Sequence, residues 1–444
     1  MRVIVVGGGI SGVSAAYLIK KHTQYEVLLI EKDTLGGKAQ SIHKDNYLIE
    51  TGPNGFLENK PDILRLISES NFDSEIIESN DYARRRFIFS GGNLIELSSN
   101  PLKLLTGKLL SRKAIINILK EPFIKPIFED ETVENFIRRR LGDEFLNKVI
   151  GPMVCGIFAG DPAIMSMESN FKRIKEIERE HGSLIKGLIN LMKNRKAKAS
   201  SASGGFDSKL LSFRNGINSF ISHLSKDLTK TTDTIITIKK EPKGYTLFGK
   251  NSEYKADIVI FATESYSLAN ILKELNPDLS NLLNQILYAP MAVVALGFDR
   301  KKLPEIVNSF GYLFALNEIK DVIGVLFDSS VFPFRSAKDK FLIRLMIGGA
   351  LAQESPFKKN LFQIATEELN RSAKIFAPFE FSYKVIHKKA IPIYTMQHKE
   401  IVKAIREFEL KQKGIFITGN AFYGISLNDC VKSAYNTLEK IKAG

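Results

Sequence analysis

The chain has 444 residues, more than one hydrophobic core usually supports, so two or three domains are expected. Its 63 Lys and Arg exceed its 49 Asp and Glu, and the net charge of +14 either favours anionic partners (phospholipid head groups, nucleic acid or carboxylated substrates) or only keeps the protein in solution. Two cysteines exclude a disulfide framework, six scattered histidines show no metal-ligand spacing, and no apolar run reaches the roughly 18 residues of a membrane span.

These exclusions predict that the protein lies in a reducing compartment, the cytoplasm, and holds no metal. A peripheral position on the inner face of the membrane is a further expectation. A signal peptide is not expected. The apolar residues 3–6 run directly into the glycines at 7–9, where cleavage would destroy a motif.

The first segment predicts a nucleotide-binding unit. The apolar run 3–6 is typical of a strand buried on both faces, and Gly7, Gly9 and Gly12 then fit G-x-G-x-x-G before a predicted helix over 13–21. Gly7 permits the tight turn, Gly9 lets the backbone approach a pyrophosphate, and Gly12 lets the helix pack close to the sheet. The phosphates are expected at the N-terminus of that helix.

A second predicted strand, 27–30, ends at Glu31, where a carboxylate can accept hydrogen bonds from ribose hydroxyls. Gly36-Gly37-Lys38 follows, and here the chain resembles the flavin amine oxidase superfamily, whose members carry Gly-Gly-Arg after the ribose carboxylate. The resemblance implies FAD. Lys38 keeps the positive charge of that arginine but loses its planar fork. The segment 50–56 is similar to the superfamily's glycine-rich stretch beside the flavin ring.

Residues 102–113 predict an amphipathic helix, with leucines on one side and Lys and Arg on the other. Such a helix either lies in a membrane interface, held by apolar burial and anionic lipid, or packs on its own domain.

The string GIFAGD at residues 156–161, followed by Met165-Ser166, resembles protoporphyrinogen oxidases, in which this backbone borders the substrate pocket. RFIFSGG at 86–92 matches the same family's Arg-Phe-x-x-x-Gly-Gly, whose arginine pairs with a propionate of the porphyrinogen. An arginine suits that task because its fork binds a carboxylate with two hydrogen bonds. Arg84 and Arg85 precede Arg86, and which of the three faces the substrate stays open.

Residues 196–209 are mostly small and polar, which predicts a connection between domains. The resemblance to the flavin amine oxidase superfamily implies that a strand at 234–238 meets the adenine through the backbone of Ile235. The apolar strand 257–263 is expected to return the chain to the nucleotide domain. Apolar runs at 291–298, 311–316, 324–327 and 341–347 then predict a mixed sheet. The resemblance implies that Leu313 and Phe332, in or beside this sheet, are the pocket leucine and the ring-stacking phenylalanine.

The last segment, 414–434, predicts a strand, a glycine turn and a helix whose N-terminus favours the negative charge of a reduced flavin. It closely resembles the ending of protoporphyrinogen oxidases. His387 stands where the superfamily has Trp, and Cys430 is interpreted as a packing residue.

The motifs and the resemblance together assign the FAD contacts to Gly7, Gly9, Ile10, Gly12, Glu31, Lys32, Gly37, Lys38, Gly52, Pro53, Asn54, Gly55, Ile235, Gly419, Asn420, Gly424, Ile425 and Leu427. They assign the substrate contacts to Arg86, Gly156, Leu313 and Phe332. No acid, base or nucleophile is assigned, because positioning is expected to provide most of the catalysis.

The expected fold class is α/β, and α+β in part: a Rossmann-like FAD-binding domain assembled from discontinuous segments, a mixed-sheet substrate domain and a helical insertion. The expected boundaries are 1–83, 204–265 and 391–444 for the FAD-binding domain, 84–203 for the helical insertion with substrate and membrane contacts, and 266–390 for the substrate domain.

The resemblance implies a six-electron oxidation of protoporphyrinogen IX in heme biosynthesis, with oxygen as the acceptor and hydrogen peroxide as its product. Coproporphyrinogen III oxidation is the first alternative; an amine oxidase, a carotenoid desaturase and a porphyrin carrier without turnover are the others. A homodimer and a complex with ferrochelatase or another heme-pathway enzyme are further expectations, and no nucleic-acid partner is expected.

Overall fold

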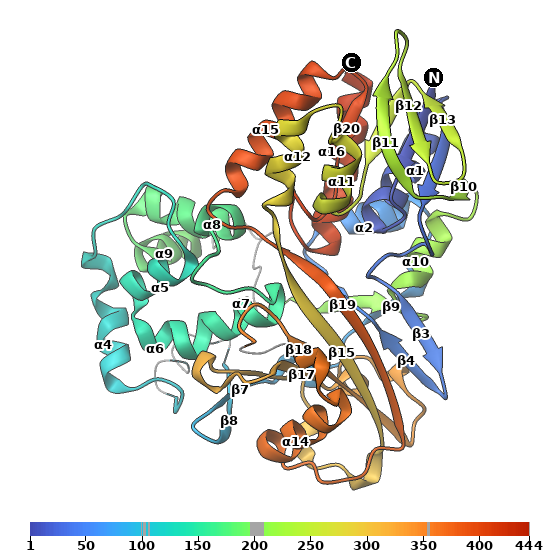
Figure 1. Ribbon diagram of the computed structural model, residues 1–444. Helices are drawn as coiled ribbons and strands as arrows, with labels where there is room; N and C mark the ends of the chain where they lie inside the picture. Colours follow the sequence, from blue (N-terminus) through green and yellow to red (C-terminus); the bar gives the residue numbers. More distant parts are fainter. Residues whose placement is uncertain (99, 101–103, 105–106, 196–207, 353–355, 444) are drawn as a thin grey trace.

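The computed structural model describes the whole chain except residues 99, 101–103, 105–106, 196–207, 353–355 and 444. Figure 1 shows a nucleotide-type unit that holds both termini, a long sheet below it and a helical unit at one side. None of the described helices combines the length and apolar character that crossing a bilayer would require.

A five-stranded sheet in the order β10-β2-β1-β14-β20 forms the centre of the first unit, and all its pairings are parallel. Its strands are β1 (Arg2–Val6), β2 (Glu26–Glu31), β10 (Thr229–Thr232), β14 (Ile258–Phe261) and β20 (Ile415–Ile417). They come from three distant parts of the chain, so the prediction of a Rossmann-like α/β unit assembled from discontinuous segments is confirmed.

Alternating apolar side chains cover both faces of this sheet. Val3 and Val5 pack into one cluster with the helices α1 (Ile10–His22), α2 (Pro61–Glu69), α10 (Ile217–Leu224) and α16 (Leu427–Ala443). Ile4 and Val6 pack into the opposite cluster, which lies under an antiparallel three-stranded sheet and three further helices. These elements are β11 (Ile235–Lys240), β12 (Tyr245–Gly249), β13 (Glu253–Ala256), α11 (Ser265–Leu272), α12 (Pro277–Asn284) and α15 (His398–Lys411). Burial on both faces is what a parallel sheet requires.

A seven-stranded mixed sheet, in the order β19-β15-β18-β17-β16-β7-β8, forms the second unit. Its strands are β7 (Arg86–Ser90), β8 (Asn93–Glu96), β15 (Leu287–Asp299), β16 (Gly311–Phe314), β17 (Val322–Leu326), β18 (Lys340–Gly348) and β19 (Phe381–Ile393). The pairing of β7 with β16 is parallel and the others are antiparallel. The sequence placed residues 84–96 in the helical insertion, but the buried run at 87–89 joins them to this sheet.

Short strands and two helices complete the two sheet units. The strands are β3 (Ser41–Lys44), β4 (Tyr47–Glu50), β5 (Phe56–Leu57), β6 (Ile76–Glu78) and β9 (Leu210–Phe213), and the helices are α13 (Asp328–Val331) and α14 (Leu361–Ala373). Strand β9, which follows the predicted connection at 196–209, pairs with both β5 and β6. It thereby joins this later part of the chain to the N-terminal segment that carries β5 and β6.

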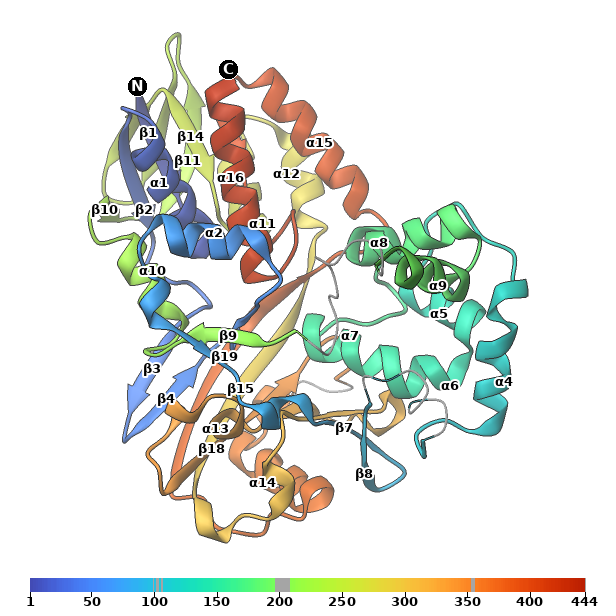
Figure 2. The ribbon, with the colours of Figure 1, turned by 180° about the vertical axis from the view of Figure 1, so that it is seen from behind.

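The helical unit lies at the left of Figure 1 and at the right of Figure 2. It contains α4 (Arg112–Lys120), the 3-10 turn η3 (Glu121–Phe123), α5 (Val133–Leu141), α6 (Asp143–Phe145), the π-helical turn η4 (Leu146–Ile150), α7 (Gly151–Phe158), α8 (Met167–His181) and α9 (Leu184–Arg195).

The amphipathic helix predicted over 102–113 is wrong at its C-terminal half. Residues 107–110 form bends, and α4 begins only at Arg112 because the side chain of Ser111 accepts a hydrogen bond from the N–H of Ala114, a helix-starting cap. Leu109 and Leu110 are buried instead of facing a membrane. Residues 101–103 and 105–106 lie outside the described residues, as does most of the predicted connection at 196–209.

A buried charge network holds the helical unit together. The guanidinium of Arg140 (α5) contacts Glu121 of η3 at 2.9 Å and Glu178 of α8 through Nε at 2.8 Å. The ammonium of Lys175 contacts Glu178 at 2.9 Å and Glu131 at 2.8 Å. Arg140, Glu121, Lys175 and Glu178 are all 0 % exposed, so these charges depend on one another for compensation.

Candidate active site

A cavity of about 470 Å³ lies where the nucleotide-type unit, the seven-stranded sheet and α7 meet. Its volume is in the range of cofactor and ligand sites. One end is lined by the carboxyl edge of the parallel sheet, the place where open α/β sheets bind ligands, and the other end by side chains of α7 and the second sheet. The cavity therefore joins a nucleotide-type site to a second compartment.

The glycine loop after β1 leaves room for a phosphate. Gly7 has a φ of +108°, which disfavours other residues, and a Cβ at Gly12 would overlap the carbonyl oxygen of Gly7. At Gly9, by contrast, an added Cβ would meet no atom within 4 Å. Gly9 also precedes the first residue of α1 and has no side chain to cap it, so the first N–H groups of the helix stay available to an anion.

Glu31 ends β2 at the cavity, as the sequence predicts. Its carboxylate accepts hydrogen bonds from the N–H of Gly8 and, at 3.1 Å, from the N–H of Asp33. Asp233, Thr234 and Ile235 complete this end of the cavity. The carboxylate is held in place beside the glycine loop, the arrangement that ribose recognition requires.

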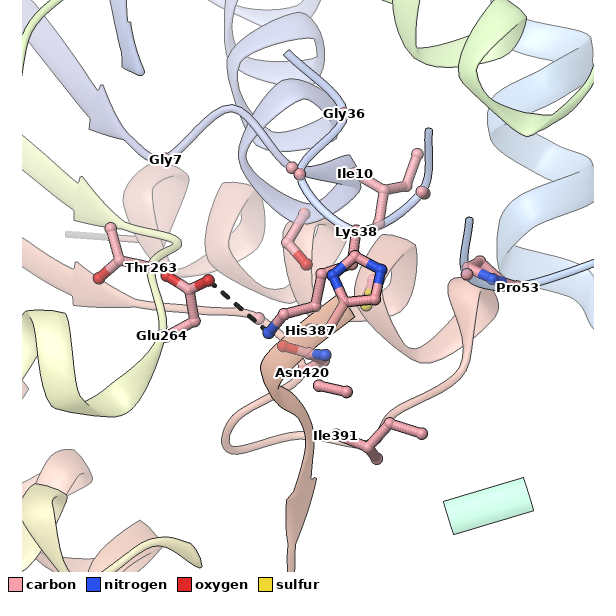
Figure 3. A pocket seen from close by; sticks show the side chains of 18 of the residues that line it. Gly7, Ile10, Gly36, Lys38, Pro53, Thr263, Glu264, His387, Ile391 and Asn420 are labelled. Atoms are coloured by element: carbon pink, nitrogen blue, oxygen red, sulfur yellow. Dashed lines mark ion pairs between the residues drawn. The ribbon is translucent and has the colours of Figure 1, made fainter. Parts of the chain in front are cut away.

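Lys38 forms an ion pair inside the cavity with Glu264, whose Oε1 lies 3.6 Å from Nζ (Figure 3). Burial lowers the pKa of Lys38, and Glu264 offsets part of that effect. Burial works toward a higher pKa for Glu264, but the charges of Lys38 and Lys32 outweigh it and hold the pKa of this carboxyl below its ordinary value. The two side chains therefore stabilise each other's charge inside the cavity.

Two buried arginines support the segment Gly52-Pro53-Asn54, which lines the middle of the cavity. Arg344 donates to the carbonyl oxygen of Glu50 and, at 3.0 Å, to the carboxylate of Asp328. Arg335 donates to the carbonyl oxygen of Asn54 at 3.5 Å and lies 3.1 Å from the carboxylate of Glu50. The segment is fixed by charge-assisted hydrogen bonds from the side away from the cavity.

Some polar atoms at the cavity have no protein partner within the described residues. They are the side-chain amide oxygen and nitrogen of Asn54 and the hydroxyl of Thr263, all buried at the atomic level. Buried polar groups are normally hydrogen-bonded. Together with the open glycine loop, these orphaned atoms fit a bound dinucleotide.

The second compartment is apolar. Ile157 and Ala159 at the end of α7 face Met291 and Val293 of β15, and the sheet adds Leu326, Met346, Ala390 and Ile391. Ala159 ends α7 in the left-handed conformation, with a φ of +50°. The string at 156–161 thus forms the last turn of α7, its cap and the start of the connection to α8.

The closing segment 419–427 borders the cavity through Gly419, Asn420, Ile425 and Leu427. The hydroxyl of Tyr394 donates to the carbonyl oxygen of Asn420 and accepts the N–H of Gly424 at 2.8 Å. The ring of His398 stacks on Tyr394 at 3.8 Å, and burial lowers the pKa of His398 to about 4, so it is neutral. Tyr394 and His398 therefore brace this loop.

The cavity brings together most of the residues to which the sequence assigns FAD contacts: Gly7, Gly9, Ile10, Glu31, Lys32, Gly37, Lys38, Gly52, Pro53, Asn54, Ile235, Gly419, Asn420, Ile425 and Leu427. Gly12, Gly55 and Gly424 lie outside its lining, where they allow close backbone packing or a turn.

Of the four residues assigned to substrate binding, only Gly156 lines the cavity. The side chain of Leu313 packs against Gly156, where it fills the space that a Cβ at position 156 would need. Phe332 is 0 % exposed and packs in a separate cluster with Ile77 and Ala83. The stacking role expected for Phe332 does not fit a ring enclosed in this way.

The three arginines before β7 differ in exposure. Arg84 and Arg85 are exposed and form ion pairs with Asp81 and Glu96. Arg86 is half-buried, its guanidinium lies 4.9 Å from the ring centre of Phe310, and burial lowers its pKa. Arg86 is thus the inward arginine of the three, although it lies outside the cavity lining; its contact with a substrate stays a prediction.

Sequence reasoning missed several residues that line the cavity, among them Asp233, Thr263, Glu264, Met291, Val293, Leu326 and Met346. Gly36 and Thr51 also line it and lie inside motifs that the sequence singled out. A signal existed for Thr263 and Glu264, because they follow the buried strand β14 and the carboxyl ends of parallel strands share one edge. No comparable signal marks the sheet residues.

Comparison with known proteins gives consistent results. The model of the family described as flavin containing amine oxidoreductase matches residues 10–441. Protoporphyrinogen oxidase 2 of Arabidopsis thaliana is 27% identical over 97% of this chain and 92% of its own length, and coproporphyrinogen III oxidase of Staphylococcus aureus is 26% identical over 99% of each. The crystal structure of a candidate protoporphyrinogen oxidase from Exiguobacterium sp. 255-15 superposes with a TM-score of 0.83 and 22% identity, covering 100% of this chain and 98% of that one.

The family match spans nearly the whole chain, and the glycine loop, the ribose carboxylate and the closing turn meet at one cavity. The protein belongs to the flavin containing amine oxidoreductase family and is an FAD-dependent oxidoreductase.

Proposed function

We propose that the protein oxidises protoporphyrinogen IX to protoporphyrin IX, a step of heme biosynthesis. The observation that carries the proposal is the apolar compartment beside Gly52-Pro53-Asn54, bordered by the last turn of α7. The full-length similarity to proteins named for protoporphyrinogen and coproporphyrinogen oxidation supports it. The macrocycle loses six hydrogen atoms over three rounds, and three molecules of oxygen become three of hydrogen peroxide.

The cofactor supplies a two-electron acceptor that is regenerated in each round. The protein's own contribution is binding and orientation. The side chains of Ile157, Met291, Val293 and Met346 exclude water and offer a surface for a flat, apolar ring system. The braced segments 50–54 and 419–427 fix the side of the cavity where the reacting carbon must lie, so positioning accounts for much of the rate.

Coproporphyrinogen III is the alternative substrate. The relative from Staphylococcus aureus matches the chain as fully as the plant enzyme does. Arg86, the half-buried arginine of the three at 84–86, suits a carboxylated substrate, whereas Arg84 and Arg85 are exposed and paired with Asp81 and Glu96.

We expect the purified, FAD-loaded protein to generate porphyrin fluorescence faster from protoporphyrinogen IX than from coproporphyrinogen III. Anaerobic bleaching of the flavin by each compound separates a catalyst from a carrier, which would bind porphyrinogen without bleaching. Oxidation of coproporphyrinogen III alone would overturn the substrate assignment. Bleaching by an amine or a carotenoid but by neither porphyrinogen would overturn the proposed function.

We also propose that the helical unit docks on an anionic membrane surface. Exposed apolar side chains lie on α4, η3 and α9, and η3 contacts both helices: Ile116, Leu119, Phe123, Leu188, Ile189 and Met192. Phe123 is 88% exposed. The same two helices carry exposed lysines at 113, 120, 186 and 193. Apolar anchors with a basic rim are typical of interfacial membrane binding.

Replacing Phe123 by glutamate is expected to reduce binding to anionic vesicles roughly tenfold, because the change removes an apolar anchor and adds a repelled charge. Sedimentation with phosphatidylglycerol vesicles at low and high salt measures the effect. The matched control is Phe376→Glu, since Phe376 is 73% exposed but lies in the loop between α14 and β19. Wild-type protein that does not sediment with the vesicles at either salt concentration would contradict the proposal.

A further inference from the structure

His387 is a histidine in the cavity that the sequence assigned to no role. It lies on β19 opposite Met291, at the irregularity where the pairing with β15 shifts register, and it borders the cavity. Figure 3 shows the side chains of His387 and Lys38 turned toward the same space. The position is thus at the junction between the nucleotide end and the apolar compartment.

The hydrogen bond made by His387 defines its tautomer. Nε2 lies 2.9 Å from the carbonyl oxygen of Thr51, and a carbonyl oxygen can only accept, so Nε2 carries the hydrogen. Nδ1 then bears a lone pair. Within the described residues no group donates to Nδ1. The imidazole is thereby oriented as a hydrogen-bond acceptor at the cavity.

The surroundings keep this imidazole neutral. Burial lowers the pKa of His387, the hydrogen bond to Thr51 opposes that effect, and the positive charge of Lys38 adds to it. Among the described residues, Lys38 is the charged side chain that acts on His387, and Lys38 is itself paired with Glu264. At neutral pH the ring is therefore able to take up a proton.

The proposed reaction requires such a group. When a bridge carbon of the porphyrinogen loses a hydrogen with its electron pair to the flavin, positive charge spreads onto the adjacent pyrrole ring. The pyrrole N–H becomes strongly acidic. Loss of its proton leaves the electron pair that completes the new double bond. Because the acid is strong, a base of low pKa is sufficient.

We propose that His387 Nδ1 accepts the proton that the macrocycle releases after each transfer of a hydrogen and its electron pair. This inference rests on the proposed function. In each round one bridge C–H bond breaks and its electron pair reaches the flavin, and one proton moves from the macrocycle to the imidazole and then to solvent. Over three rounds the three hydrides come from bridge carbons, and the three protons come from two pyrrole nitrogens and the remaining bridge carbon. Four C–H and two N–H bonds therefore break, and six hydrogen atoms are lost.

The other ionisable groups at the cavity are already engaged. Glu31 accepts hydrogen bonds from the backbone of Gly8 and Asp33, and Glu264 is ion-paired with Lys38. Asp233 accepts hydrogen bonds from backbone N–H groups of the turn at 250–251. Burial raises the pKa of Cys430 to about 11, so its thiol is protonated. Of the ionisable side chains that line the cavity within the described residues, His387 therefore offers a neutral, basic nitrogen that no protein group engages.

The variant His387→Gln tests the inference, because glutamine retains a donor for Thr51 and lacks the basic nitrogen. We expect unchanged FAD content and unchanged binding of protoporphyrin IX, measured by fluorescence quenching. Anaerobic flavin reduction by protoporphyrinogen IX is expected to slow about 100-fold, the usual contribution of a positioned base. His43→Gln is the control, since His43 lies on the exposed strand β3.

The pH profile of flavin reduction adds a second measurement. The unprotonated imidazole is the active form, so the wild-type rate is expected to fall as the pH falls through a pKa below the ordinary value of about 6.5. His387→Gln should lose that acidic limb. If the variant keeps both the rate and the limb of the wild type, His387 does not accept the proton, although porphyrinogen oxidation itself would stand.

The tautomer can be measured without turnover. Nitrogen-15 NMR of the oxidised, FAD-loaded protein is expected to show the signal pattern of a neutral ring protonated at Nε2, and this signal is absent from His387→Gln. A ring protonated at Nδ1 would overturn the inference. A wild-type protein that has the expected tautomer yet no reaction with either porphyrinogen would instead refute the proposed function.

Discussion

Replacing Gly9 by alanine is expected to leave a folded protein that has lost its yellow colour. Gly9 has a φ of −72°, which alanine adopts without strain, and its added Cβ would meet no protein atom within 4 Å. The methyl group would occupy the space into which a phosphate must come to reach the N-terminus of α1. We expect FAD affinity to fall roughly 100-fold or more, about 2.7 kcal/mol, as measured by titration of the apoprotein.

Ser14→Ala is the matched control for Gly9→Ala. Ser14 lies on the same helix, is 0 % exposed and does not line the cavity, so its loss should leave FAD affinity unchanged. The melting temperature of the apoprotein should be the same for wild type and Gly9→Ala. An FAD affinity equal to that of the wild type would show that the pyrophosphate does not approach Gly9.

Replacing Arg140 by methionine is expected to lower the free energy of unfolding by about 3 to 5 kcal/mol. Methionine fills much of the volume but leaves Glu121 and Glu178 with one positive charge fewer in a region that water does not reach. The helical unit should unfold first, because the lost contacts join η3, α5 and α8. Urea denaturation followed by circular dichroism measures the change.

Arg138→Met is the control for this change on the same helix. Arg138 is half exposed, and its ion pairs with Glu134 and Asp143 are solvated, so its loss should cost less than about 1 kcal/mol. Equal effects of the two substitutions would mean that the buried network contributes no more than a surface pair.

The nucleotide end of the site could be read from the sequence because local rules determine it. A buried run, three spaced glycines and a carboxylate at the next strand end require only the geometry of one strand-turn-helix-strand unit. Gly7, Gly9 and Glu31 converge on the cavity in the structure, as do Gly52-Pro53-Asn54 and the closing segment 419–427, while Gly12 packs the helix against the loop. The family and the cofactor inferred from them are confirmed.

The apolar compartment could not be read in the same way. Met291, Val293, Leu326 and Met346 are apolar residues of long strands, and in sequence they do not differ from neighbours that face the core. Which of them face the cavity depends on strand register, and a shift of one residue reverses it. The helix expected at 102–113 was wrong at residues 107–110 for a related reason, since leucine periodicity alone did not distinguish a buried bend from a helix.

The order of strands in the parallel sheet has a consequence for synthesis of the protein. Strand β20, at the edge beside β14, and helix α16, which packs on α1, come from the last part of the chain, while β1 comes from its first residues. Segment 419–427, which closes the cavity, also emerges late from the ribosome. The cavity is therefore complete only once the last segment has been made, and we expect a chain that ends before residue 415 to be degraded rather than to act as an enzyme of reduced activity.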